Sequence, residues 1–426
     1  MHCNTILYKV VNFAYYVFLY DEEDISRDRK ELSMKKRCFS NILRSAMSLL
    51  LAVSLLMGTV PVVFAASEAA GSTQVQSSIN KLDNNAILNN YMQYLNGNVV
   101  FKLPEGITED DDLSVIVRVD RTSVMEAYNR TDKTLSLQEY LLTDEAKDVM
   151  DAIADRKAEL LTLFDEQGID YTLGEDYTTL FSGFELLIKG GDYVATCQSL
   201  GAAESVAISN AYKPMDTELV ENEVNVLESG IFNTTGIKYD GTGMVVAVLD
   251  TGLDSNHTAF SPNNFSSNQL GLTYDQVAAL VAGTKTNELS NGGLTVDNVF
   301  INNKVPFGYD YADRDPDVYS THNNHGTHVS GVIVGNDDVI TGVAPNAQLV
   351  SMKIFSDIQD TAMSSWILAA LEDCVILGVD VINMSLGTAC GFSHEGEEEL
   401  VSGVYLRLRD AGVAVVVAAS NSYNSA

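Results

Sequence analysis

The chain has 426 residues, 46% of them apolar, and its 58 acidic against 26 basic residues give a formal net charge of −32. This length leaves room for two or three domains with sizeable cores. The negative charge argues against nucleic acid and anionic membrane surfaces as partners and is typical of a soluble, secreted protein.

The first recognisable feature is a short basic segment followed by an apolar run. Met34-Lys35-Lys36-Arg37 precedes the mostly apolar residues 46–64, and the small residues Ala65-Ala66 follow. This order predicts a secretory signal peptide over residues 34–65. A lone membrane anchor is the alternative, although a proline interrupts the run. We interpret residues 1–33 as an over-extended start of the gene.

A small domain is expected next. Residues 66–112 are rich in Ser, Asn, Gln and Asp, which predicts a flexible polar segment. The elements expected after it are a strand at Val115–Val119, a helix at Ala146–Phe164, a strand-like stretch around Gly183 at Thr178–Ile188, a helix at Asp192–Leu200 and a strand at Ser205–Ile208. A β-α-β-β-α-β order fits an α+β, ferredoxin-like domain over residues 113–215. An independent binding module is the alternative.

Strands and helices then alternate to the end of the chain. The expected strands are Val245–Asp250, Leu349–Phe355, Val379–Met384 and Val413–Ala419, and helices are expected from His325, over Ala362–Leu377 and over Glu397–Ala411. This alternation predicts the α/β class, with a parallel sheet covered by helices on both faces. The carboxyl ends of the strands, where such sheets place their chemistry, should meet at one edge.

Two motifs contain the candidate catalytic residues. The first strand ends in Val-Ala-Val-Leu-Asp-Thr-Gly, which places the Asp250 carboxylate at a buried strand end. The second motif, His-Gly-Thr-His-Val-Ser-Gly, starts at His325 and predicts a helix with this imidazole at its exposed first turn. Together they resemble the first two blocks of the subtilisin-like serine proteases. The resemblance implies that Asp250 orients His325 and that His325 is the general base.

Two further blocks follow in the order of that family. Residues 380–387 resemble its substrate-binding strand, which implies that Ser385-Leu386-Gly387 pairs with the backbone of a peptide substrate. Residues 415–421 resemble the strand before the oxyanion-hole asparagine, which implies that Asn421 donates its amide to the oxyanion. Four blocks in the same order make the resemblance specific.

The nucleophile block of the family, Gly-Thr-Ser-Met-Ala, does not occur in the sequence. We therefore expect residues 216–426 to be the amino-terminal portion of a subtilisin-like catalytic domain, in a chain that is inactive alone. The full-length reaction would be serine-mediated hydrolysis of peptide bonds in proteins, through an acyl-enzyme. The alternative is a short product that acts as a non-catalytic peptide-binding or inhibitory module.

The resemblance also implies a role for the small domain and a location. Ahead of such a catalytic domain, residues 113–215 resemble the inhibitory propeptide, which occupies the active site until it is cleaved, here in the region of Asn210 to Glu221. Residues 305–313 resemble the cell-envelope subtilases of Gram-positive bacteria. We expect a secreted or extracellular protein associated with the cell envelope. Its expected partners are protein or peptide substrates and its own propeptide, with no nucleic acid and no membrane partner after signal cleavage.

Other chemistries fit the sequence less well. His322, His325 and His328 could suggest a metal, but no HExxH-type general base accompanies them. Gly241-Thr242-Gly243 precedes a strand, whereas a dinucleotide fingerprint follows one. No metal or cofactor is therefore expected for catalysis. Structural calcium stays open, because the loop Gly335–Gly342 lies where one calcium site of the family falls.

Overall fold

The computed structural model describes residues 101–104, 106–201, 203–214, 239–265, 269–359, 361–387 and 397–418. All of them belong to one compact unit of the chain, residues 93–426. The predicted signal peptide, the over-extended start, Asn421 and the predicted domain boundary at residues 215 and 216 lie outside the described residues.

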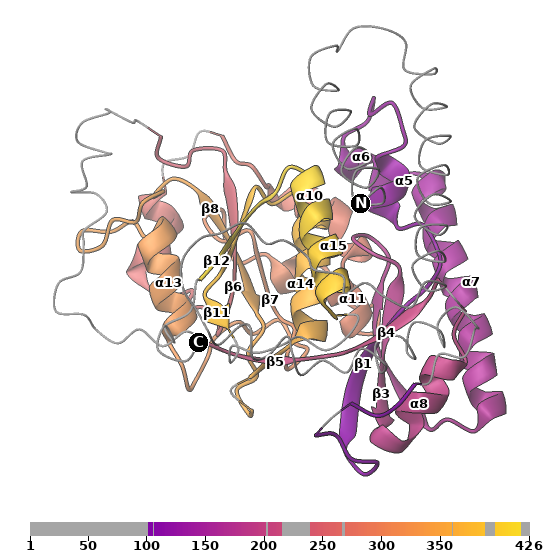
Figure 1. Cartoon of the computed structure of the whole chain (residues 1–426). Helices are drawn as coiled ribbons and strands as arrows, with labels where there is room; N and C mark the ends of the chain where they lie inside the picture. The colour runs from indigo at the N-terminus through magenta and orange to yellow at the C-terminus, as the bar shows by residue number, and fades with distance from the viewer. Residues whose placement is uncertain are drawn as a thin grey trace, which may run out of the picture. The chain divides into compact units, whose positions relative to one another are not determined.

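Four antiparallel strands form the sheet of the amino-terminal region, in the order β2-β3-β1-β4. The strands are β1 (Asp112–Arg118), β2 (Tyr171–Tyr177), β3 (Gly183–Lys189) and β4 (Ser205–Ile208). The helices are α5 (Val124–Tyr128), α6 (Leu137–Leu141), α7 (Asp144–Gln167) and α8 (Gly190–Gln198). With α7 and α8 as the crossover helices, this region has the β-α-β-β-α-β order (Figure 1).

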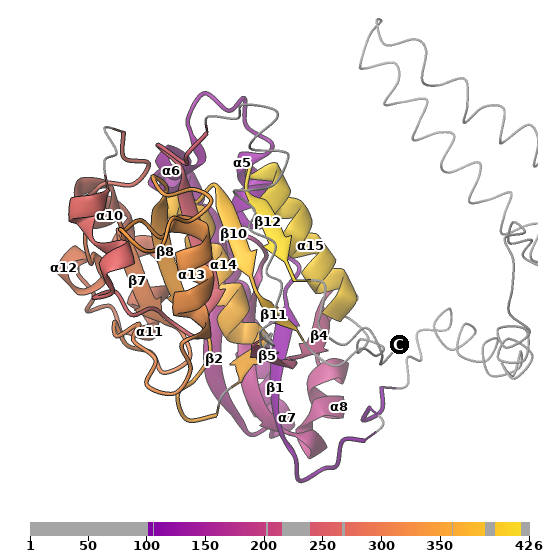
Figure 2. The ribbon, with the colours of Figure 1, turned by 90° about the vertical axis from the view of Figure 1, so that its left-hand side faces the viewer.

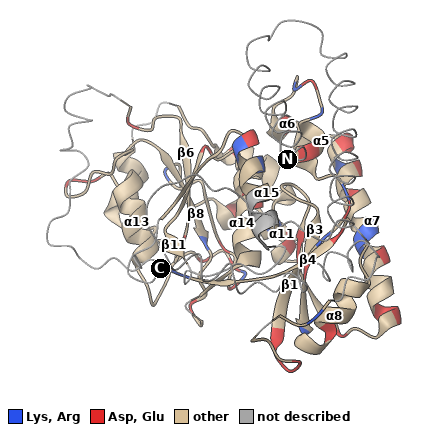
Figure 3. Ribbon diagram, viewed as in Figure 1, with Lys and Arg blue, Asp and Glu red and all other residues tan. Residues whose placement is uncertain are grey.

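Helix α7 shows why the local sequence folds this way. Thr143 caps its first turn by accepting a hydrogen bond from the Ala146 amide, and Gly168 ends it in the left-handed conformation, with φ of 72°. Its buried Ile153, Leu160 and Phe164 pack with the sheet. Acidic and basic residues both occur along the helix (Figure 3), as expected of a helix with one face in water.

The expected strand-like stretch over Thr178–Ile188 is a strand only from Gly183 on. Strand β2 ends at Tyr177, residues 178–182 form a turn, and β3 begins at Gly183. The buried Leu180 and Phe181 of this turn belong to the core of the carboxyl-terminal region. A short apolar run does not by itself distinguish a strand from a turn that is buried against another element.

The carboxyl-terminal region is built on a five-stranded sheet of order β12-β10-β6-β8-β7, in which every pair is parallel. The strands are β6 (Val245–Asp250), β7 (Phe307–Asp310), β8 (Gln348–Lys353), β10 (Val381–Met384) and β12 (Ala414–Val417). The α-helices are α10 (Tyr274–Leu280), α11 (Lys285–Leu289), α12 (Val296–Val299), α13 (His325–Val334), α14 (Ser364–Leu377) and α15 (Glu397–Asp410). Short 3-10 helices are η3 (Thr258–Phe260), η4 (Pro262–Asn264) and η5 (Val281–Gly283). The predicted α/β class with a parallel sheet is confirmed.

Strand β6 lies at the centre of this sheet and is buried on both faces. Val245, Ala247 and Leu249 belong to the apolar cluster that contains α14. Val246 and Val248 belong to a different cluster, which contains residues of α13. Because side chains alternate along a strand, the two helices cover opposite faces of the sheet, as expected (Figure 1).

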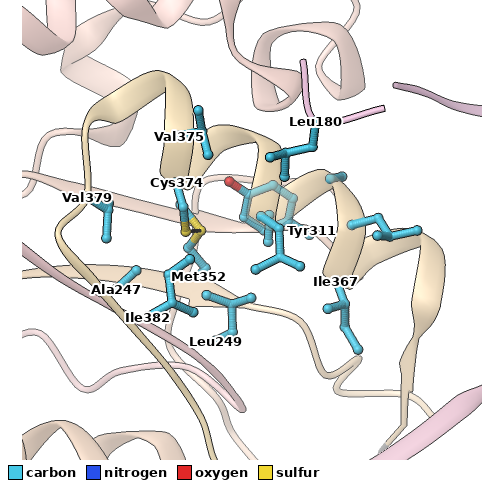
Figure 4. Packing of buried hydrophobic residues seen from close by; sticks show 14 of the residues in the cluster. Leu180, Ala247, Leu249, Tyr311, Met352, Ile367, Cys374, Val375, Val379 and Ile382 are labelled. Atoms are coloured by element: carbon cyan, nitrogen blue, oxygen red, sulfur yellow. Dashed lines mark hydrogen bonds between the residues drawn. The ribbon is translucent and has the colours of Figure 1, made fainter. Parts of the chain in front are cut away.

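The two regions share one apolar core. In β1, Val115 and Val117 pack with α7, whereas Ile116 points to the other face and joins the cluster around α14. Leu180 lies in the same cluster as Tyr311 and Cys374, and Figure 4 shows the three side chains together. A third, small sheet of order β11-β5-β9 also joins the regions, through β5 (Ala211–Pro214), β9 (Ala362–Met363) and β11 (Leu386–Gly387) (Figure 2).

Candidate active site

The first candidate side chain stands at the end of β6. Asp250 is 1% exposed. Its Oδ1 accepts a hydrogen bond of 2.7 Å from the amide of Thr251, which follows it directly. Because all six residues of β6 are buried, the strand fixes the position of the carboxylate.

His325 is the first residue of α13, as predicted, but the expectation that its imidazole is exposed was wrong, since the residue is only 7% exposed. The Asn323 side chain accepts a hydrogen bond of 2.9 Å from the His325 amide, although the position next to the helix, Asn324, makes no side-chain cap. The asparagine that accepts this hydrogen bond therefore lies one position before the usual capping position of the helix.

The structure brings Asp250 and His325 together across 75 positions of sequence. Nδ1 of the imidazole lies 2.6 Å from Oδ1 of the carboxylate, and both groups are buried. In the neutral ring, the nitrogen that faces the carboxylate carries the proton, which leaves Nε2 as a proton acceptor. Oδ2 of Asp250 accepts no hydrogen bond from the described residues.

Gly326 and Gly252 allow strand β6 and helix α13 to approach each other closely at this pair. A Cβ at Gly326 would lie 2.3 Å from the carbonyl oxygen of Gly252 and 3.1 Å from the Cβ of Asp250, so only glycine fits there. The Gly326 amide also donates a hydrogen bond of 2.9 Å to the Thr251 hydroxyl. The Thr-Gly after Asp250 and the Gly after His325 are thus the residues through which strand and helix contact each other.

The predicted substrate-binding segment, Ser385-Leu386-Gly387, follows β10 at the same edge of the sheet. Its last two residues form β11, and β11 pairs antiparallel with β5, with Leu386 opposite Pro214 and Gly387 opposite Lys213. On its other side, β5 pairs with β9. An extended segment from the end of the amino-terminal region therefore lies between two strands of the carboxyl-terminal region.

The remaining candidates are not brought into the site. Asn421 lies outside the described residues. His322 and His328 are exposed, and the structure shows no group of three or more potential metal ligands in the parts of the chain that it describes. In the loop Gly335–Gly342, both carboxylate oxygens of Asp337 accept hydrogen bonds, from the Thr258 hydroxyl and from the amides of residues 339 and 340.

Sequence reasoning missed three features of the carboxyl-terminal region and of its contact with the amino-terminal region. Strand β5 is only four residues long and has no distinct pattern. Lys353 and Glu372 are charged residues buried within an apolar strand and an apolar helix, at 1% and 0% exposure. A charge inside an otherwise apolar element is the signal that could have found both, since charged side chains are seldom fully buried without a partner.

Comparison with known proteins adds independent findings. Residues 241–426 match the model of the subtilase family. The PI-type proteinase of Lactococcus lactis subsp. cremoris is 29% identical over 327 residues, which cover 74% of this chain and 16% of that protein. The C5a peptidase of Streptococcus pyogenes serotype M3 is 32% identical over 191 residues, which cover 42% of this chain and 15% of that protein. The chain thus spans about one sixth of the length of these relatives.

Among solved structures, fervidolysin from Fervidobacterium pennivorans, described as a keratinolytic enzyme related to subtilisin, aligns with 76% of this chain and 42% of its own. The TM-score is 0.45 and the sequence identity is 16%.

Proposed function

Residues 241–426 belong to the subtilase family of serine proteases, and from this premise we propose that they are part of a secreted endopeptidase that hydrolyses peptide bonds in proteins. One observation carries the proposal: the buried hydrogen bond of 2.6 Å between His325 and Asp250. A histidine whose Nδ1 proton is donated to a buried carboxylate has an unprotonated Nε2, the atom that acts as the general base.

In the proposed reaction, Nε2 of His325 removes the proton from a serine hydroxyl and later donates it to the leaving amine. Asp250 holds the ring in the required tautomer and stabilises the imidazolium that forms. Asn421 would donate its side-chain amide to the oxyanion, a contact whose removal typically costs about 3 kcal/mol of transition-state stabilisation. The serine itself is proposed to follow residue 426, and no metal or cofactor takes part. Calcium, if the protein binds it, has a structural role.

The groove for the substrate backbone is proposed to be the space between β9 and β11. Its support is the strand β5, which lies there and pairs with both neighbours. An extended peptide added between two strands uses main-chain hydrogen bonds, as a protease substrate does. We propose that residues 113–215 are the inhibitory propeptide and that β5 lies where a substrate would bind.

The location follows from the expected signal peptide. Residues 34–65 would direct the protein out of the cell, and an association with the cell envelope is supported by the resemblance of residues 305–313 to the cell-envelope subtilases of Gram-positive bacteria. No described helix is long and apolar enough to span a membrane. The proposed partners are protein or peptide substrates, as the match to the subtilase family suggests, and the protein's own propeptide.

The proposal is tested by sequencing the gene past codon 426 and expressing the complete product beside the 426-residue chain. We expect an in-frame Gly-Thr-Ser-Met-Ala block, hydrolysis of casein and labelling by a fluorophosphonate for the complete product. The 426-residue chain should give neither hydrolysis nor labelling. A stop codon at that point would favour a peptide-binding or inhibitory module, for which the pairing of β5 in the groove is the supporting observation. Labelling of the short chain would mean that a different serine is the nucleophile.

A further inference from the structure

Three neighbouring strands of the parallel sheet end in charged residues at the same level. In the register of the sheet, Lys353 at the end of β8 lies opposite Asp250 of β6 on one side and opposite Asp310 of β7 on the other. Lys353 is 1% exposed and Asp310 is 2% exposed. A buried ammonium group therefore occupies the strand position adjacent to the proposed catalytic carboxylate.

Three carboxylates surround this ammonium group. Nζ of Lys353 forms an ion pair with Asp310 and lies 3.3 Å from Asp313 and 3.7 Å from Asp357. Although burial alone lowers it, the pKa of Lys353 is raised above its ordinary value by these carboxylates, Asp310 first. Burial raises the pKa of Asp310 to about 6, against the hydrogen bond from Lys353. Near neutral pH the pair is therefore charged on both sides.

The cluster continues towards His325 through hydrogen bonds. Oδ1 of Asp357 accepts a hydrogen bond of 2.9 Å from the Ser320 hydroxyl. The oxygen of that hydroxyl accepts one of 3.2 Å from the Asn323 amide. The side chain of Asn323 accepts one of 2.9 Å from the His325 amide. Four consecutive contacts thus join the buried ammonium group to the first residue of α13.

The stem of Lys353 also supports the other member of the catalytic pair. A Cβ at Gly252, two residues after Asp250, would lie 3.0 Å from Cδ of Lys353 and 2.3 Å from the carbonyl oxygen of Val318. That carbonyl accepts a hydrogen bond of 2.7 Å from the Leu253 amide. The segment that follows Asp250 therefore lies against the stem of Lys353 and is hydrogen-bonded to Val318, in the segment that precedes His325.

We propose that Lys353, Asp357 and Ser320 act as positioning residues, which fix the backbone before His325 so that its imidazole stays in contact with Asp250. This inference rests on the proposed function of that pair. Buried ion clusters contribute little net stability compared with apolar packing, so stability alone does not account for a lysine here. The need for a fixed geometry accounts for the buried lysine, because the residues around catalytic groups must hold them to within a fraction of an ångström.

Ser320→Ala is the variant that tests the relay, because it removes one hydroxyl and leaves the ion pairs of Lys353 in place. Ser320→Thr keeps the hydroxyl and should restore the parent behaviour. The matched control is Ser114→Ala, since Ser114 is also partly buried and also donates to a carboxylate, that of Glu185, in the amino-terminal region. Lys353→Met, checked first for folding by circular dichroism, removes the centre of the cluster.

The readout is the Nδ1–H proton of His325 in the 426-residue chain with ¹⁵N-labelled histidine, followed by NMR at low field. The chain has six histidines, and the signal is assigned by its loss in His325→Ala. We expect the proton of Ser320→Ala to exchange with water about tenfold faster than in the parent, the effect of one lost hydrogen bond on an opening equilibrium. Lys353→Met should lose the signal, whereas Ser320→Thr and Ser114→Ala should keep it.

Two other outcomes have distinct meanings. If the parent shows the signal and Ser320→Ala exchanges at the parent rate, the positioning role is wrong while the proposed function stands. If the folded parent shows no such signal, His325 is not held by Asp250 in solution. That result overturns the proposed function and, with it, the positioning role.

Discussion

The amino-terminal region contacts the parallel-sheet region in two different ways. At α14 the contact is made by a side chain: Glu372 is fully buried and accepts hydrogen bonds of 3.1, 2.9 and 2.8 Å from the amides of Thr178, Thr179 and Leu180. At the small sheet the contact is made by backbone: β5 pairs with β9 and β11, and the side chains of Ala211 and Lys213 are exposed.

The two contacts therefore have different roles: the contact at α14 recognises one specific turn, whereas the backbone pairing of β5 fills the groove without recognising a particular sequence. A buried carboxylate that accepts three amides of one turn can hold only a partner with that turn, and such charge-assisted bonds are the stronger kind. Backbone pairing accepts almost any extended sequence, as a groove for varied substrates must. We therefore expect α14 to hold the amino-terminal region in place and β5 to occupy the groove with little affinity of its own.

The largest effect is expected from Glu372→Ala, which would leave three buried amides without their acceptor. Removing a buried, hydrogen-bonded charge typically costs about 3 kcal/mol or more. The free energy of unfolding in urea should fall by that amount, and the amides of residues 178–180 should lose their protection from hydrogen exchange. The control is Glu166→Ala, an exposed residue of α7, which should change the free energy of unfolding by less than about 0.5 kcal/mol. A loss below about 1 kcal/mol for Glu372→Ala would remove the distinction between the two contacts.

A pH dependence should come from Glu175, which lies in β2 and forms an ion pair of 2.8 Å with Arg314 of the other region. Burial raises its pKa from 4.5 to about 7, although Arg314 opposes the shift. A raised carboxyl pKa means that the contribution of this group to stability is present below pH 4.5 and is lost as the pH rises through about 7.

Glu175→Gln should therefore reduce the loss of stability between pH 5 and pH 8 by about 2 kcal/mol, since one pKa unit corresponds to about 1.4 kcal/mol and Arg314 is half exposed. The measurement is the urea midpoint of parent and variant at both pH values, with Glu166→Gln as the matched control. Equal pH dependence in parent and Glu175→Gln would show that Glu175 is hydrated in solution.

The smallest effect is expected from Lys213→Ala in β5. The side chain is exposed and the strand pairs through its backbone, so the free energy of unfolding should change by less than about 0.5 kcal/mol. Urea unfolding of the variant beside the parent gives the answer. A loss above about 1.5 kcal/mol would mean that β5 is recognised by its side chains, contrary to the proposed role of the groove.

The sequence was most informative where its periodicity and its motifs agreed. The buried run Val245–Leu249 can only be a central strand, and Asp250 follows it. The start of α13 at His325 was correctly placed because two asparagines precede it. The pairing of these two residues was expected from the resemblance of their motifs to the first two blocks of the subtilisin-like serine proteases.

The features that were missed depend on contacts between distant segments. The turn at residues 178–182 and the burial of Glu372 explain each other, but they are almost 200 positions apart. Likewise, His325 is buried in contact with Asp250, which lies 75 positions away in the sequence. Local pattern does not contain such pairings, so a charged residue in an apolar element was the only available sign.

We propose that Asp250 contributes to catalysis by holding the His325 imidazole in the required tautomer. The kcat/KM of the complete gene product for casein tests this role most directly. Asp250→Asn should lower it by about 10⁴-fold, because the imidazole loses the group that fixes its tautomer. Asp254→Asn, the matched control four residues further on, should leave it within about twofold of the parent, since in the part of the chain that the structure describes its carboxylate accepts a local hydrogen bond from the Asn256 amide. Equal activity of Asp250→Asn and Asp254→Asn would contradict the account.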